Sequence, residues 1–179
     1  PYSGARLEDV RIYLINVNAE AAMITDKPYL PGRIINAGML NMDDIMKFSD
    51  RSMMMQEVEG TIGPETRQTG ISLLCYPNES TEEGPGTPFT RLVIEGKVNG
   101  KTYYWPVNAG EDELNPGVRR NCRYTYDIRI TRLGGNDPDV PRGRVRHDFA
   151  QLRPGVVERT VLLAVAFYII AELAEMFEL

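Results

Sequence analysis

The sequence holds one histidine, and an acid beside it makes this pair the first candidate for catalysis. His147 is followed directly by Asp148 in the run R-V-R-H-D-F. A histidine oriented by a carboxylate can act as a general base in a hydrolase. No nucleophile motif such as G-x-S-x-G accompanies the pair. We therefore expect a solvated surface histidine, and a protein that is not an enzyme and uses no cofactor.

A group of oxygen-bearing side chains is the next candidate, in this case for a metal ion. Asn136, Asp137 and Asp139 have the alternate spacing seen in calcium loops. The glycine and glutamate that complete such a loop are missing. The sequence therefore predicts a polar turn here and no metal site.

One tripeptide has the pattern of an N-glycosylation site. Asn78, Glu79 and Ser80 form the sequon N-x-S. The same pattern occurs in many loops by chance, so it assigns no function by itself.

Consecutive aromatic residues form a candidate ligand-binding patch. Tyr103, Tyr104 and Trp105 stand together, and exposed aromatic rings are suited to stacking against sugars. On a strand, aromatic side chains more commonly fill a core or cover an edge, which is the interpretation we favour. Tyr103 and Trp105 remain the basis of an alternative function, a surface carbohydrate- or host-binding module.

The two cysteines leave the redox state open. Cys75 and Cys122 each lie in a strand-like segment, on the apolar side of the alternation. Two buried free thiols in adjacent strands is the commoner arrangement. A disulfide between them is the alternative, and would suit an exported protein.

Composition limits the classes of function. The net charge is −5, and no segment is rich in lysine and arginine, so nothing favours nucleic-acid binding. The apolar fraction of 42% and charged fraction of 25% are typical of a soluble globular protein. The longest apolar run, Val161 to Ala171, has 11 residues and is too short to cross a bilayer as a helix.

Most of the chain has the pattern of β-strands. Residues 7–18 carry apolar side chains on both sides of the alternation, which predicts a strand buried on two faces. After a long loop, Asn41 is the expected N-cap of a short helix that ends near Phe48. Further strands are predicted over residues 53–59 and 71–76.

The clearest local signal is a β-hairpin. Asn99-Gly100 favours a type I′ turn, because both residues tolerate positive φ. The paired strands are expected over residues 92–98 and 101–107. Pro106 has no N–H to donate, which places the second strand at an edge of its sheet.

A further strand over residues 122–131 alternates strictly. One face is apolar and the other polar, so one side should meet the core and the other water. The apolar face comprises Cys122, Tyr124, Tyr126, Ile128 and Ile130. Together these patterns predict a mainly β protein, an antiparallel β-sandwich of about six to seven strands with one short helix.

Two blocks of sequence resemble the fimbrillins, the pilus subunits of Bacteroidales. They are T-R-L-V-I-E-G-K-V-N-G-K-T-Y-Y-W-P-V-N and R-R-N-C-R-Y-T-Y-D-I-R-I-T-R-L-G-G-N-D-P-D-V-P. Residues 11–18 and 73–80 fit the same family. The resemblance covers about Leu7 to Pro141 and matches the second of the family's two β-sandwich domains. The family's first domain and lipid-bearing export signal have no counterpart here.

The resemblance implies a structural role at the cell surface. Such subunits are exported lipoproteins, attached to the outer membrane, that polymerise into a fimbria (pilus) and support cell adhesion. Polymerisation works by strand exchange, in which a terminal segment of one subunit fills a groove in the next. The implied partners are other fimbrial subunits, and host or bacterial surface ligands. The break at residues 134–138 would let the following segment leave its own domain, or is a plain surface turn.

The tail departs from the family pattern, and we divide the chain there. Residues 1–141 are expected to form the fimbrillin-like domain, and 142–179 a tail that is a candidate donor or interaction segment. Helical spacing of apolar residues favours a helix in the tail, whereas β-branched and aromatic residues over 161–170 favour a strand. We expect the tail to stay outside the core of the body and to dock on a neighbouring molecule. The candidate donor positions are Val161, Leu163, Val165, Phe167 and Ile169.

Overall fold

The computed structural model describes residues 6–22, 27–48, 50–63, 67–110, 117–130, 132–140, 147–148 and 161–169. For residues 48, 67–69, 127 and 129, and for all those beyond 140, it describes the backbone alone. The protein is mainly β, with two short helices in the described part, and most of its strand pairs are antiparallel.

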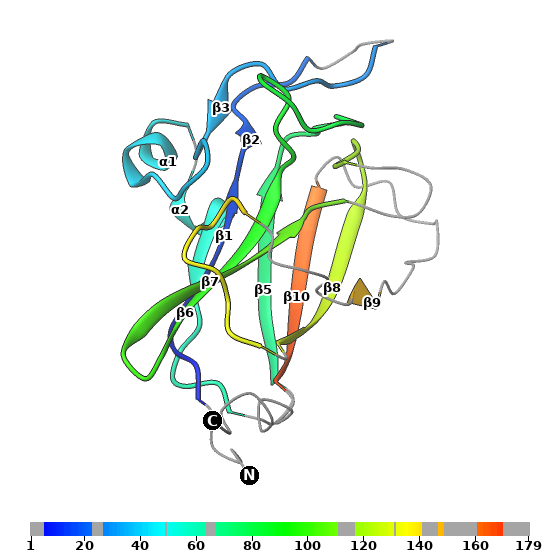
Figure 1. Ribbon diagram of the computed structural model, residues 1–179. Coiled ribbons are helices and arrows are strands. Elements are labelled where there is room, and N and C mark those ends of the chain that lie inside the picture. The colour runs from blue at the N-terminus through cyan, green and yellow to red at the C-terminus, as the bar shows by residue number, and fades with distance from the viewer. Residues whose placement is uncertain are drawn as a thin grey trace.

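The first sheet has four strands, all antiparallel to their neighbours, in the order β4-β1-β6-β7 (Figure 1). These strands are β1 (Glu8–Ile15), β4 (Met55–Glu57), β6 (Arg91–Val98) and β7 (Lys101–Asn108). The predicted hairpin is confirmed as β6 and β7, with φ of 51° at Asn99 and 76° at Gly100. β7 lies at the edge of the sheet, as the proline at position 106 requires.

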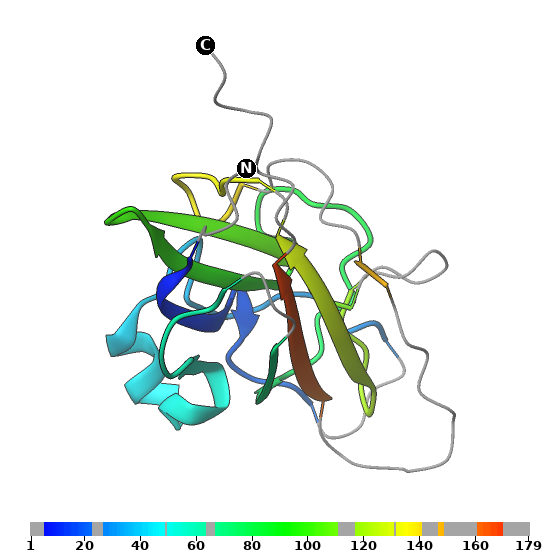
Figure 2. The ribbon, with the colours of Figure 1, turned by 90° about the horizontal axis from the view of Figure 1, so that it is seen from below.

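The second sheet is mixed, in the order β5-β10-β8-β9. Its strands are β5 (Arg67–Cys75), β8 (Arg123–Ile130), β9 (His147–Asp148) and β10 (Val161–Ile169). β10 is antiparallel to β5 but parallel to β8, which it follows along its whole length (Figure 2). A wholly antiparallel arrangement was predicted, so the β8–β10 pair is a correction.

Short elements cover one end of the first sheet. They are the two-residue pair β2 (Val17–Asn18) and β3 (Ile34–Ile35), and the helices α1 (Met42–Phe48) and α2 (Arg51–Met54). The predicted N-cap is confirmed, because the side chain of Asn41 accepts hydrogen bonds from the N–H groups of Asp43 and Asp44. The predicted strand over 53–59 is shorter than expected, since Asp50 caps α2 before β4 begins.

The buried apolar side chains of both sheets form one cluster. Both sides of β1 are buried, with Ile12, Tyr13 and Leu14 at most 1% exposed, so the prediction of a strand buried on two faces is confirmed. In β8, Tyr126 and Ile128 are buried as predicted, whereas Arg123 is exposed. The described residues form ten strands, more than the six to seven predicted. Several of them have only two or three residues, too few to show the alternation of apolar and polar residues from which strands were predicted.

Two strands lie beyond the predicted boundary at residue 141. β9 pairs with β8, and β10 pairs with both β5 and β8. The described parts of the tail therefore lie in the body's own sheet rather than projecting from it. Val161–Ile169 is a strand, which is one of the two alternatives for the tail; residues 170–179 lie outside the described part.

Candidate functional site

The candidate site is the slot between β5 and β8 that β10 fills. Neither flanking strand pairs directly with the other, because β10 separates them over its whole length (Figure 1). On one side the register runs from Val161↔Cys75 to Phe167↔Arg67, and on the other from Leu162↔Arg123 to Ile169↔Ile130. Without β10, both strands would present unpaired N–H and C=O groups, which is the state that receives another strand.

Four of the five candidate donor positions stand in register with buried residues of the flanking strands, whereas Val161 is paired with the half-buried Cys75. Leu163 is paired with Leu73 of β5, and Phe167 with Ile128 of β8. Leu73 and Ile128 are both 0% exposed. Positions 163, 165, 167 and 169 are therefore at the same register level as buried residues of β5 or β8.

The segment that leaves β8 is attached to the first sheet. Trp105 donates its indole N–H to the carbonyl of Arg132 at 3.0 Å, and Tyr104 and Gly135 exchange main-chain hydrogen bonds. Further along, the carboxylate of Asp139 accepts from the Asn16 side chain at 2.8 Å. The chain is therefore held on both sides of the predicted break at residues 134–138, and residues 141–146, which follow it, lie outside the described part.

The predicted polar turn is also present in this segment. The carboxylate of Asp137 accepts from the N–H of Asp139 at 2.8 Å, the local contact of an Asx turn. Asp139 lies 3.1 Å from a guanidinium nitrogen of Arg91. Asp137 thus stabilises the turn, and Asp139 attaches the segment to Asn16 and Arg91. The described residues contain no group of three or more metal-binding side chains.

The aromatic patch does not form an open platform. Trp105 is 6% exposed, and its N–H is used by Arg132. Tyr103 is half-buried. The centre of its ring lies 6.3 Å from the centre of the Trp105 ring and 5.3 Å from the Lys101 amine. Of the two predicted residues, only Tyr103 presents a ring surface, and stacking against a sugar through Trp105 would need the core to open.

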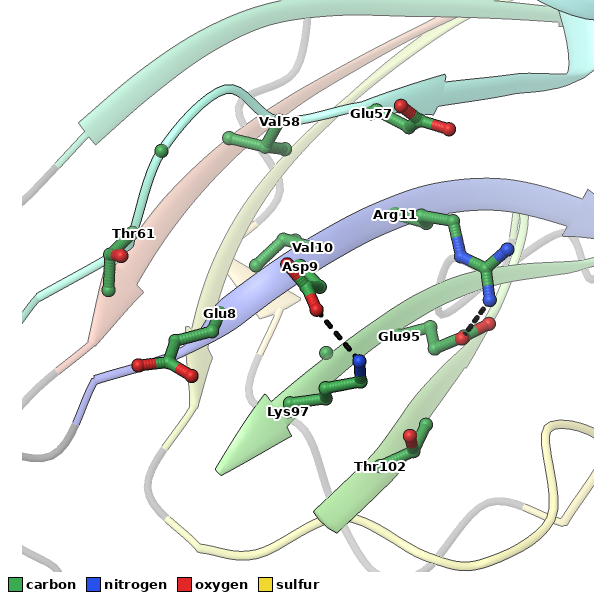
Figure 3. Close-up of a pocket in the computed structure, with 12 residues that line it drawn as sticks. Glu8, Asp9, Val10, Arg11, Glu57, Val58, Thr61, Glu95, Lys97 and Thr102 are labelled. Carbon is green, nitrogen blue, oxygen red and sulfur yellow. Dashed lines mark hydrogen bonds and ion pairs between the residues drawn. The ribbon is translucent and has the colours of Figure 1, made fainter. Parts of the chain in front are cut away.

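A charged hollow lies beside β1, β4 and β6 (Figure 3). Lys97 donates to the carboxylate of Asp9 at 2.8 Å, and this hydrogen bond holds the pKa of Asp9 below its usual value. Arg11 pairs with the largely buried carboxylate of Glu95. These pairs join side chains across neighbouring strands, so sequence spacing gave no signal for them. Glu8 and Glu57 also line the hollow, which therefore holds more acidic than basic side chains, and we assign no ligand to it.

The glycosylation sequon is not accessible in this fold. Asn78 is 1% exposed, and its amide donates to the Pro88 carbonyl at 2.8 Å and to the Thr90 hydroxyl at 3.1 Å. The amide nitrogen that a glycan would modify is therefore buried and bonded.

The histidine–aspartate pair considered for catalysis, and the two cysteines, lie in or next to strands of the second sheet. His147 and Asp148 form β9, paired with Ile128 and Asp127, and a catalytic role for their side chains stays untested. Cys75 and Cys122 are free thiols, both half-buried. They do not lie in adjacent strands as predicted, because β10 stands between β5 and β8.

Comparison with known proteins adds no relative. No family model, no curated protein and no solved structure matches the chain. Among the helices of the described residues, none is long and apolar enough to cross a membrane.

Proposed function

We propose that this chain is a structural subunit of a cell-surface fimbria, which polymerises by strand exchange and supports adhesion. In this proposal the two sheets form the β-sandwich expected from the sequence, and β10 is the exchanged element. One subunit would place its β10 in the slot between β5 and β8 of the next subunit. The partners are other fimbrial subunits, and the location is the outer membrane of the exporting cell.

The position of β10 is the observation that supports this proposal. It is a central strand of its sheet, yet it is the last described strand of the chain, and residues 131–160 separate it from β8. Its main-chain hydrogen bonds are the same whether the strand comes from its own chain or from a neighbour. Exchange of an identical element therefore costs little free energy once the strand has opened.

The fimbrillin-like blocks of sequence are the second support. They include the hairpin β6–β7 and the strand β8, and both have the strand boundaries that the sequence predicted to within one residue. The buried Trp105 removes the main feature that favoured a carbohydrate-binding module.

A substitution in β10 tests the proposal in the full chain. Ala164 pairs with Ser72 on one side and Thr125 on the other, so Ala164→Pro removes an N–H from the middle of the sheet. Sedimentation velocity should show concentration-dependent association of the wild type and none of the variant. Ala164→Ser, which keeps the N–H, is the matched control and should associate like the wild type. A wild type that stays monomeric at all concentrations would exclude self-polymerisation.

A further inference from the structure

The two cysteines lie on either side of β10, at the same level of the sheet. Cys75, at the end of β5, is paired with Val161. Cys122 lies just before β8 and precedes Arg123, which is paired with Leu162; continuing this parallel register by one residue would place Cys122 level with Val161. One strand position is therefore flanked by a thiol-bearing residue on each side.

With β10 in place, the thiols are too far apart to react with each other. Neighbouring strands lie about 4.8 Å apart, so residues two strands apart are separated by about 9 to 10 Å. A disulfide requires Cα atoms about 4.4–6.8 Å apart. Burial also raises the pKa of the Cys75 thiol to about 12, which keeps it in the unreactive protonated form.

Removal of β10 would change this geometry. β5 is antiparallel to β10 and β10 is parallel to β8, so β5 and β8 are antiparallel to each other. If they closed to pair directly in the same register, Cys75 would stand opposite Cys122. Cys75 belongs to the same row as Ile71 and Leu73, which lie in the common core, and Cys122 precedes β8 with the same alternation as Tyr124 and Tyr126.

We propose that Cys75 and Cys122 are a conditional disulfide site, which is barred while a strand fills the slot and forms when the slot is empty. The bridge would fasten β5 to β8 and prevent a donor strand from entering. This consequence for assembly rests on the proposed function, whereas the bridge itself requires only that β10 can leave.

The oxidant is a small-molecule disulfide, such as oxidised glutathione. One cysteine thiolate attacks it, which forms a mixed disulfide and releases one glutathione thiolate. The second cysteine thiolate then attacks the protein sulfur of the mixed disulfide and releases the other. Two protein thiols are oxidised, one glutathione disulfide is reduced to two thiols, and the two protons pass to the released thiolates.

The test compares the full-length wild type with Ala164→Pro and Ala164→Ser under oxidised glutathione. Mass spectrometry of proteolytic peptides identifies the Cys75–Cys122 link. We expect it to form at least about ten times faster in Ala164→Pro than in the other two proteins, and within one molecule. Equal rates in all three proteins would overturn the proposal, as would only glutathione adducts or intermolecular bridges in Ala164→Pro.

Two further measurements separate a closed slot from an unfolded chain. Bridged Ala164→Pro should keep a cooperative thermal transition, at a higher temperature than its reduced form; a bridge without any transition would overturn the proposal. In an otherwise wild-type, folded chain, Val161→Cys should form a disulfide with Cys75 or Cys122. A disulfide between Cys75 and Cys122 in that variant would contradict the proposed conditional site. These readouts do not depend on association. If the bridge forms in a protein that never polymerises, the proposed function is refuted and the conditional disulfide site still stands.

Discussion

Tyr104 and Gly135 exchange two main-chain hydrogen bonds, of 3.0 and 2.8 Å, and so attach the segment after β8 to the outer edge of β7. This pair joins the two sheets through the backbone and covers an edge strand that would otherwise be open at that position. The segment that leads toward β10 therefore starts from a fixed point on the body, and any exchange of β10 must take place beyond this attachment.

The attachment makes Gly134 intolerant of a side chain. A Cβ at this position would lie 2.4 Å from the Tyr104 carbonyl oxygen and 2.9 Å from a ring carbon of Trp105. We expect Gly134→Ala to lower the free energy of unfolding by about 1–3 kcal/mol, measured by urea denaturation. Gly32→Ala is the control, because nothing lies within 4 Å of its Cβ. Equal stability of the two variants would show that the Tyr104–Gly135 attachment adapts without cost.

Among the described side chains of β8, the buried ones beside the slot are Tyr126, Ile128 and Ile130. Ile128 is 0% exposed and is paired with Phe167 of β10. Its replacement by Ala removes buried methyl groups and leaves a cavity, so Ile128→Ala should cost about 2–5 kcal/mol in chemical denaturation. Arg123→Ala, at an exposed position of the same strand, should change stability by less than about 0.5 kcal/mol. A small effect of Ile128→Ala would mean that the faces of β8 are assigned the wrong way round.

Acid should weaken an ion pair at the start of β6. The buried guanidinium of Arg91 donates to both carboxylate oxygens of Glu83, at 2.6 and 2.8 Å, and holds the pKa of Glu83 below its usual value of 4.5. The lowered pKa stabilises the fold above pH 4.5, and this contribution is lost as the pH falls through the folded value. Glu83→Gln should therefore be less stable than the wild type at pH 7, and the gap should narrow as the pH falls below 4.5.

The control for this titration is Glu82→Gln, which removes the neighbouring exposed carboxylate. As a change at an exposed position, it should alter stability at pH 7 by less than about 0.5 kcal/mol. A gap for Glu83→Gln that does not narrow as the pH falls would assign the loss to packing rather than to charge.

Local patterns predicted the elements that depend on local contacts. The type I′ turn at Asn99-Gly100 fixes its own hairpin, and the alternation after Cys122 fixes the faces of β8, so both were found from the sequence. The burial of Trp105 was also the favoured interpretation. These features need no knowledge of distant partners.

The slot could not be predicted, because its partners are far apart in the sequence. The apolar residues of Val161–Ile169 suit a helix or a strand equally, and the choice is made by the hydrogen bonds that β5 and β8 offer on both sides. Likewise, the burial of Asn78 depends on Pro88 and Thr90, and the separation of the two cysteines depends on β10. Pairings of this kind carry no signal in a single sequence.

Strand exchange requires that β10 of one subunit fill the slot of another, and a disulfide trap detects this arrangement. Thr125 and Ala164 are paired across β8 and β10, and neighbouring strands are about 4.8 Å apart, within disulfide range. Thr125→Cys with Ala164→Cys, in a chain whose Cys75 and Cys122 are replaced by Ser, should form this bridge on oxidation. Each single variant serves as the control, since it lacks the partner thiol.

The readout is a non-reducing gel of protein oxidised at concentrations where sedimentation shows association. Strand exchange predicts a ladder of covalent multimers that collapses to monomer on reduction, because each bridge then joins two chains. Bridged protein that migrates only as monomer under these conditions would contradict the account, since every β10 would then lie in its own chain.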